Sequence, residues 1–276
     1  MAFGCGERSH DATSSFIILF VIEGDEMTKP AIKGQSAATL VWFAYAVISV
    51  MLAVLSSWAL YSKANYGYPF WYQQLQIGEH IQQYGPQNRF KTGLELLPAE
   101  QHWKAFEQIR VAVHQHGKGL TGIVYQPPGW SPRPLLHAAE VQHLQDVANL
   151  IDRGRTLFWV LLILWIPVAM AACRLGMPPM QHRLAAAVIA TGAVLAWLGI
   201  AGPTEVFYQF HLWLFPADHQ WFFYWQDSLM STLMKAPVLF GGIAAVIALG
   251  ALLLLPAFYW LGLVAAAKIQ RQKNRS

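Results

Sequence analysis

Four long stretches of this chain carry no charged side chain, and they restrict the possible folds more than any other feature. They occupy residues 40–61, 156–173, 184–203 and 236–267. A helix of about 20 apolar residues crosses a hydrocarbon core of about 30 Å. Buried helices of a soluble protein are a poor alternative, because only 12% of the residues are charged, against about a quarter in soluble domains. The stretches therefore predict an integral membrane protein with four transmembrane helices.

The basic residues beside these stretches predict the orientation of the chain. Short cytoplasmic flanks carry an excess of Lys and Arg. The residues concerned precede the first stretch, lie between the second and third, or follow the fourth: Lys29, Lys33, Arg174, Arg183, Lys268, Arg271, Lys273 and Arg275. These three segments share one side of the membrane in any four-span topology, so both termini are predicted to be cytoplasmic. The basic flanks also account for the net charge of +4 without a nucleic-acid partner.

The predicted fold is an all-α membrane protein with a mainly helical extracytoplasmic domain between the first two transmembrane helices. The expected segments are a cytoplasmic N-terminal segment 1–38, transmembrane helices 39–61, 156–173, 184–203 and 236–267, an extracytoplasmic domain 62–155, a cytoplasmic loop 174–183, an extracytoplasmic interfacial loop 204–235 and a cytoplasmic tail 268–276. The apolar run SFIILFVI near the N-terminus is too short to span and has acidic flanks. Met27 is therefore an alternative start.

Sequence patterns divide the outer segments further. PAEQHWKAFEQIRVAVHQHG, residues 98–117, repeats apolar side chains at three- and four-residue spacing, which predicts an amphipathic helix. GIVYQPPGWSPRP, residues 122–134, is predicted to be a loop, after which helical periodicity resumes toward the second span. The segment from Gly202 to Lys235 is dense in Trp, Tyr and Phe, which is typical of chain lying at the membrane interface.

Two outer histidines have neighbours that favour acid–base chemistry. Glu140 and Asp146 lie three residues either side of His143, so a helix places all three on neighbouring positions. His211 lies among apolar residues, in an expected loop, with Asp218 close in sequence. Both segments adjoin the outer ends of spans, so the two rings can meet there. Four other outer histidines are interpreted as surface or packing residues: His102, His114, His116 and His137.

The sequence resembles the lipoprotein intramolecular transacylase (Lit) family of bacterial membrane proteins. The motifs that carry this resemblance are HLQDVANL at residues 143–150, FHLWLFPAD at residues 210–218, the following Trp221, the DSLM run from Asp227, Pro237, and KTGLELLPAEQ in the outer domain. The resemblance covers nearly the whole chain from the first span to the fourth. Two positions depart from the family pattern: Leu144 stands where Met is usual, and Ala217 stands where an Asn is usual.

The resemblance implies an enzyme that moves an acyl chain from the sn-2 oxygen of a lipoprotein's diacylglyceryl cysteine to the α-amino group of that cysteine. It implies no metal or cofactor, an active site on the extracytoplasmic face of the cell inner (cytoplasmic) membrane, and as partners the lipidated N-terminus of lipoproteins and membrane phospholipid. The residues assigned are His143 and His211 as general base and acid in either order, Asp146, Glu140 and Asp218 as orienting groups, and Arg153, Arg155 and Trp221 as substrate contacts.

The residues alone leave other functions open. An acid beside a histidine on a helix is often only a solvated face. The main alternative is a non-enzymatic membrane lipid-binding or envelope assembly protein, which would depend on the aromatic outer segment rather than on titrating histidines. A cytochrome with paired axial histidines is disfavoured because the spans contain no histidine. A transporter is disfavoured because the spans contain no acid or base that would mark an ion path.

Overall fold

The computed structural model describes residues 32–273. The alternative start at Met27 and most of the expected N-terminal segment lie outside the described residues. The longer helices are α2 (Ile32–Lys63), α5 (Ala99–His114), α6 (Ala138–Leu175), α7 (Met180–Leu214) and α9 (Val238–Lys273). The shorter elements are η1 (Asn65–Gly67), α3 (Tyr68–Gln74), α4 (Ile77–Tyr84), η2 (Gly85–Gln87), η3 (Leu94–Leu96), η4 (Leu120–Gly122), β1 (Val124–Tyr125), β2 (Arg133–Pro134) and α8 (Leu229–Met234).

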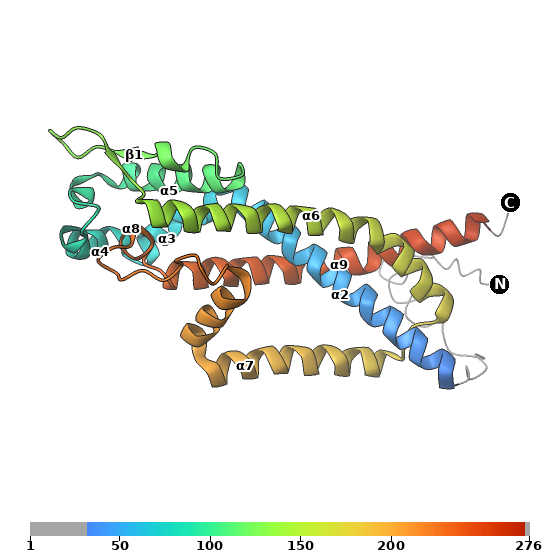
Figure 1. Cartoon of the computed structure of the whole chain (residues 1–276). Coiled ribbons are helices and arrows are strands. Elements are labelled where there is room, and N and C mark those ends of the chain that lie inside the picture. Colours follow the sequence, from blue (N-terminus) through green and yellow to red (C-terminus); the bar gives the residue numbers. More distant parts are fainter. Residues whose placement is uncertain (1–31, 274–276) are drawn as a thin grey trace, which may run out of the picture.

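Within residues 32–273, four helices are long and apolar enough to cross a membrane: Ser36–Lys63 of α2, α6, Met180–Gly202 of α7, and α9. Helices α2, α6 and α9 pack against one another and form a bundle (Figure 1). Between the ends of α6 and α9, the bundle core is built around Tyr45 of α2, with small residues such as Ala169, Ala172 and Ala266 allowing the helices to approach closely. The expectation of a mostly helical protein with four apolar helices is confirmed.

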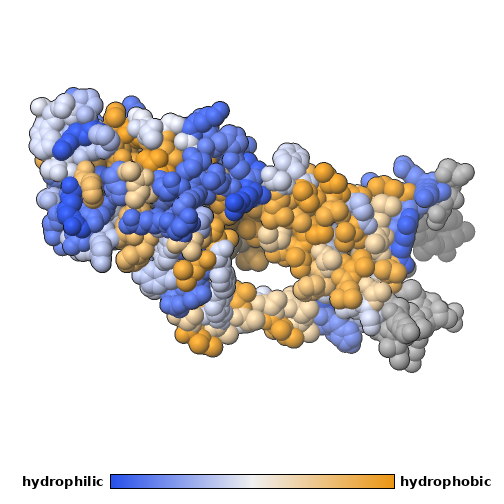
Figure 2. Space-filling view, in the orientation of Figure 1, coloured by the Kyte–Doolittle hydropathy of each residue, from blue (hydrophilic) through white to orange (hydrophobic). Residues whose placement is uncertain are grey.

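Helix α7 stands away from this bundle over its first part. No side chain between residues 179 and 202 is buried, and Figure 2 shows open space between this part of α7 and the other helices. Gly202 interrupts the helix with φ 79° and ψ 154°, a conformation that favours glycine. After Gly202 the helix turns back toward the bundle (Figure 1). This turn carries His211, four residues before the C-cap Phe215, toward α6.

A cap lies at one end of the bundle and comprises α3, α4, α5, α8 and the β1–β2 hairpin (Figure 1). Its surface is largely hydrophilic, whereas the helices beyond it are largely hydrophobic outside (Figure 2). The core of the cap is apolar; in it the ring of Tyr68 stacks on Phe106 at 4.0 Å, and the Tyr68 hydroxyl donates to the carbonyl of Leu233 at 2.6 Å. The segment before α9 is thus tied to the segment after α2.

Two sequence-based predictions of local structure need correction. The region expected to be a loop, 122–134, contains the antiparallel pair β1–β2, in which Val124 lies opposite Pro134. His211 was expected in a loop but lies in the last turn of α7, because the helix continues past Gly202 to Leu214. The backbone at Gly202 is not helical, so α7 consists of two helical segments joined by a kink, and the second segment ends at Leu214.

Candidate active site

The rings of His143 and His211 face each other where α6 meets the end of α7. Their centroids are 6.1 Å apart and the ring planes differ by 28°. His143 lies in the second turn of α6, near the cap, and is partly buried. His211 is buried, with 9% of its surface exposed. Residues 68 positions apart in the sequence are therefore brought together, as expected for the two histidines.

Aromatic side chains surround this pair. Phe215 lies against both rings, 5.0 Å from His143 and 5.2 Å from His211 between centroids. Trp221 lies 4.9 Å from His211, and Phe223 lies 6.2 Å from His143. The segment after α7 therefore folds back over the two histidines and shields them from water. Trp221, one of the residues assigned from sequence, lies at this site.

A backbone hydrogen bond sets the tautomer of His211. Its Nδ1 lies 2.7 Å from the carbonyl oxygen of Phe207, one helical turn earlier. A carbonyl only accepts, so Nδ1 carries the proton and Nε2 holds a free lone pair. Burial lowers the pKa of His211 below its usual value, an effect that the Phe207 hydrogen bond partly opposes. At neutral pH the ring is therefore neutral and Nε2 is able to accept a proton.

Glu140 is placed differently from the sequence-based assignment. Its carboxylate accepts from Lys91 Nζ at 2.7 Å, from the backbone N–H of Leu229 at 2.6 Å, and from that of His137 at 3.1 Å. Lys91 and Glu140 are each 1% exposed. The helix start turns the carboxylate back toward the N-cap residue, as in a capping box, so it does not orient His143. It joins α6 to the segments before and after it in the cap instead.

Asp146 also has a partner that the sequence did not suggest. Its carboxylate lies 2.7 Å from Nδ1 of His219, in the segment after α7, and the Gln142 amide lies 3.3 Å from the same nitrogen. The Asp146 side chain is 8% exposed and that of His219 is 31% exposed. His219 directly follows the FHLWLFPAD motif and was overlooked in the sequence, because the acid that pairs with it, Asp146, lies 73 residues earlier. The pair fastens the segment after α7 to α6.

The expected pairing of Asp218 with His211 is not found. Asp218 is exposed and makes no hydrogen bond or ion pair with the described residues. His211 instead uses its Nδ1–H for the Phe207 carbonyl, which the helical geometry places within reach. Proximity in sequence did not translate into contact, because Phe215 and Pro216 end the helix and lead the chain away.

The two arginines assigned as substrate contacts lie further along α6. Arg153 is exposed. Arg155 donates to Asp152 at 3.1 Å and to the carbonyl of His114 at 2.8 Å, so its guanidinium is already used between α6 and α5. Burial and the nearby Arg155 lower the pKa of His114 to about 4.

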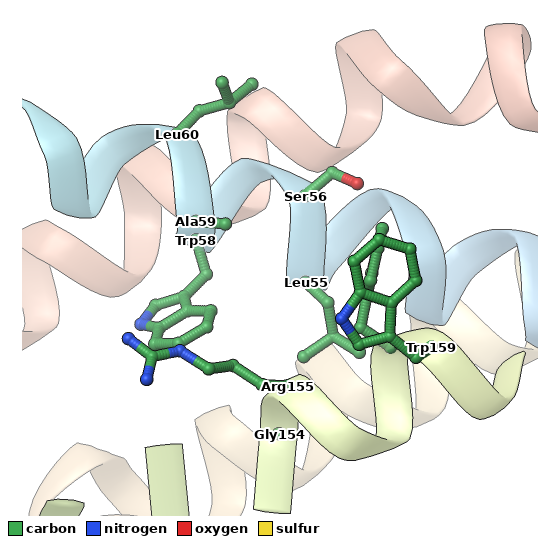
Figure 3. Close-up of a pocket in the computed structure, with 9 residues that line it drawn as sticks. Leu55, Ser56, Trp58, Ala59, Leu60, Gly154, Arg155 and Trp159 are labelled. Carbon is green, nitrogen blue, oxygen red and sulfur yellow. The ribbon is translucent and has the colours of Figure 1, made fainter. Parts of the chain in front are cut away.

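Arg155 also lines a pocket of about 350 Å³ between α2 and α6 (Figure 3). Trp58 and Trp159 border this pocket, and its other lining residues are mostly apolar. Neither His143 nor His211 lines it. The pocket and the histidine pair are therefore separate features of α6.

The arrangement suits proton transfer in a site from which water is largely excluded. A neutral imidazole with a free nitrogen and a second imidazole facing it can accept and return one proton. Within residues 32–273, no group of three or more His, Cys, Asp or Glu side chains is placed to hold a metal ion. The described side chains therefore offer acid–base groups and aromatic surfaces.

Comparison with known proteins identifies the family. The profile of the lipoprotein intramolecular transacylase Lit matches residues 37–236, which include the cap, both histidines and the segment after α7. Among solved structures, the chain is similar to the membrane integral lipoprotein intramolecular transacylase Lit of Bacillus cereus, determined in meso as a variant with one histidine replaced by arginine. The identity is 16% and the TM-score 0.49, over 83% of this chain and 93% of that one. No curated protein matches the chain. The family profile covers well over half of the chain, which therefore belongs to the lipoprotein intramolecular transacylase (Lit) family.

Proposed function

We propose that this protein transfers an acyl chain within the lipidated N-terminal cysteine of bacterial lipoproteins, from the sn-2 ester oxygen of the diacylglyceryl group to the α-amino nitrogen. The product is a lyso-form lipoprotein with an N-acyl, mono-acylglyceryl cysteine. The observation that carries the proposal is the pair of facing imidazoles, His143 and His211, inside an aromatic enclosure in a member of this family.

His211 is the proposed base. The α-amino group has a pKa near 8 and must be neutral to attack an ester carbonyl. Nε2 of His211 holds a lone pair because Nδ1–H is bonded to Phe207. As the nitrogen–carbonyl bond forms, Nε2 takes a proton from nitrogen; as the carbon–oxygen bond breaks, the glyceryl oxygen gains a proton. His143 faces the same space, so either ring can return that proton to the oxygen.

Correct positioning of the ester and the amine accounts for much of the rate enhancement that acid–base catalysis does not supply. Donor ester and acceptor amine belong to one molecule, so no acyl-enzyme is needed and no second substrate has to bind. A site that holds the two groups in contact lowers the barrier by several kcal/mol. Trp221, Phe215 and Phe223 are proposed to form the walls that fold the substrate. Their rings also lower the local dielectric, which strengthens the polar contacts of the transition state.

We propose that the cap faces the extracytoplasmic side of the cell inner membrane. The end of α6, the start of α7 and the end of α9 lie at the opposite end of the bundle (Figure 1) and carry Arg174, Arg183 and Arg271 respectively. Short cytoplasmic segments are rich in such residues. Both termini are then cytoplasmic, and the outer segments 62–155 and 204–235 meet at the histidine site. In this orientation Arg153 is exposed near the outer headgroups and is the proposed contact for lipid phosphate.

The test is mass spectrometry of the N-terminal lipopeptide of one abundant lipoprotein. Cells expressing the unmodified protein are compared with cells expressing His143→Ala with His211→Ala. We expect N-acyl, mono-acylglyceryl cysteine only with the unmodified protein. His116→Ala, which removes a ring 65% exposed outside the site, is the matched control and should convert the lipoprotein normally. Equal conversion by the double variant and the unmodified protein, with both present in the membrane, would contradict the proposal.

A further inference from the structure

The pair Asp146–His219 lies beside the histidine site along α6 and reaches the surface. Asp146 lies one turn along α6 from His143 and is almost wholly buried, whereas a third of the His219 side chain is exposed. The separation of their bonded atoms is 2.7 Å. Since the carboxylate only accepts, His219 Nδ1 carries the proton and its Nε2 is free. The pair thus begins beside the buried rings and ends at the surface.

The proposed reaction releases a proton when the amine enters in its charged form. An ammonium group and an ester give an amide, an alcohol and one proton. One nitrogen-bound proton ends on the glyceryl oxygen, and the second must leave the site. At pH 7 an amine of pKa near 8 is mostly charged, so most turnovers produce this excess proton. An aromatic enclosure with few polar groups cannot keep it, because an unpaired charge in such surroundings is costly.

We propose that Asp146 and His219 form the outlet for this proton. The inference rests on the proposed function and deepens it. The ammonium proton passes by way of His143 or His211 to the Asp146 carboxylate. The partly exposed ring of His219 turns its lone-pair nitrogen toward Asp146, takes the proton there and releases the proton of its other ring nitrogen to water. No covalent bond of the substrate changes in this step. Asp146 and His219 are not catalytic residues in this scheme, since they act through the two facing rings.

The groups around His219 are consistent with this role. From α6 it meets the Asp146 carboxylate and the Gln142 amide. Asp218 precedes it in its own segment and is exposed. His143 and His211 are the other titratable groups of the site. A negative carboxylate between the enclosed rings and the surface favours movement of a positive charge outward. A chemically similar pair, His116–Asp152 at 2.6 Å, lies elsewhere on the surface and serves as a control.

The experiment measures kcat of the purified full-length protein in mixed micelles. The substrate is a synthetic peptide with a dipalmitoylglyceryl cysteine, and the product is measured by mass spectrometry. Near pH 6 almost every substrate amine is charged, and near pH 9 most are neutral. We expect His219→Gln to reduce kcat at least about tenfold near pH 6 and to remain within about twofold of the unmodified protein near pH 9. Asp146→Asn should show the same pattern, and His116→Gln should show no change at either pH.

Two results would overturn the inference while leaving the proposed function standing. One is an equal loss at both pH values, which indicates that the pair only holds the structure in place. The other is no loss at either pH. Failure of the unmodified protein to convert the peptide would overturn the proposed function, and this inference with it. The unfolding temperature of each variant shows whether it is folded, and the two substitutions at different ends of the pair serve as independent tests.

Discussion

The buried ion pair Lys91–Glu140 gives the sharpest test of how the cap is held together. Lys91 lies between η2 and η3, and Glu140 lies in the first turn of α6. Their charged atoms are 2.7 Å apart and both side chains are 1% exposed. The same carboxylate accepts the N–H of Leu229. The pair therefore links three segments that together position the residues around His143 and His211.

Substitution Lys91→Met removes the positive charge and keeps most of the side-chain volume. Glu140 is then left as a buried carboxylate with backbone donors from Leu229 and His137 and with the His137 ring 3.7 Å away, but without the Lys91 charge. Breaking a buried pair in this way costs about 3–5 kcal/mol. For a chain of this size, each kcal/mol lowers the unfolding temperature by about 2–4 °C, so we expect a fall of about 6–20 °C. Adding Glu140→Gln should recover part of this loss, because it removes the unpaired charge.

The assay is thermal unfolding of the purified protein in detergent, with Arg89→Met as the matched control. Arg89 pairs with Asp227 through two hydrogen bonds of 2.6 and 2.5 Å, and the Arg89 side chain is 64% exposed whereas that of Asp227 is 19% exposed. A pair whose cation is largely solvated contributes about 1 kcal/mol, so this control should lower the unfolding temperature by no more than about 4 °C. If Lys91→Met lowers the unfolding temperature no more than Arg89→Met does, the buried pair does not stabilise the cap and the prediction is wrong.

Two further predictions follow from the backbone and from burial. Gly202→Ala should lower the free energy of unfolding by on the order of 1–3 kcal/mol and reduce acyl transfer, since Ala disfavours φ 79° and a straightened α7 moves His211 away from His143. The control Gly199→Ala, in open helical surroundings, should leave acyl transfer unchanged. Equal acyl transfer by the two variants would contradict this prediction. The pKa of His114 is lowered to about 4 in the folded protein, against about 6.5 for an ordinary histidine in the unfolded chain. Between these pH values the unfolded chain binds a proton that the folded protein does not, so the free energy of unfolding falls as the pH falls through this window. His114→Gln should therefore show a smaller drop in unfolding temperature between pH 7 and 5 than the unmodified protein, and an equal drop would refute it.

Features that depend on local sequence could be predicted. Charge-free runs indicated the four long helices, and three- to four-residue spacing of apolar side chains indicated α5, found at Ala99–His114. Both signals arise within one helix and need no knowledge of its neighbours. The turn in α7 was harder to predict. Gly202 marked the expected end of a span, yet the helix resumes beyond it, because glycine permits the bend and the following residues still favour a helix.

The partners of the carboxylates could not be predicted, and the reason is physical. Spacing along a helix tells which side chains share a face, but not which group from another segment reaches that face. Glu140 bonds to Lys91, 49 residues earlier, and Asp146 bonds to His219, 73 residues later. Each carboxylate is almost buried, where an unpaired charge is costly, so it is stable there only because the cap and the segment after α7 bring a donor to it. The acids that pointed from sequence to His143 thus fasten the segments that enclose it, and the enclosed histidine pair depends on contacts that only the folded chain makes.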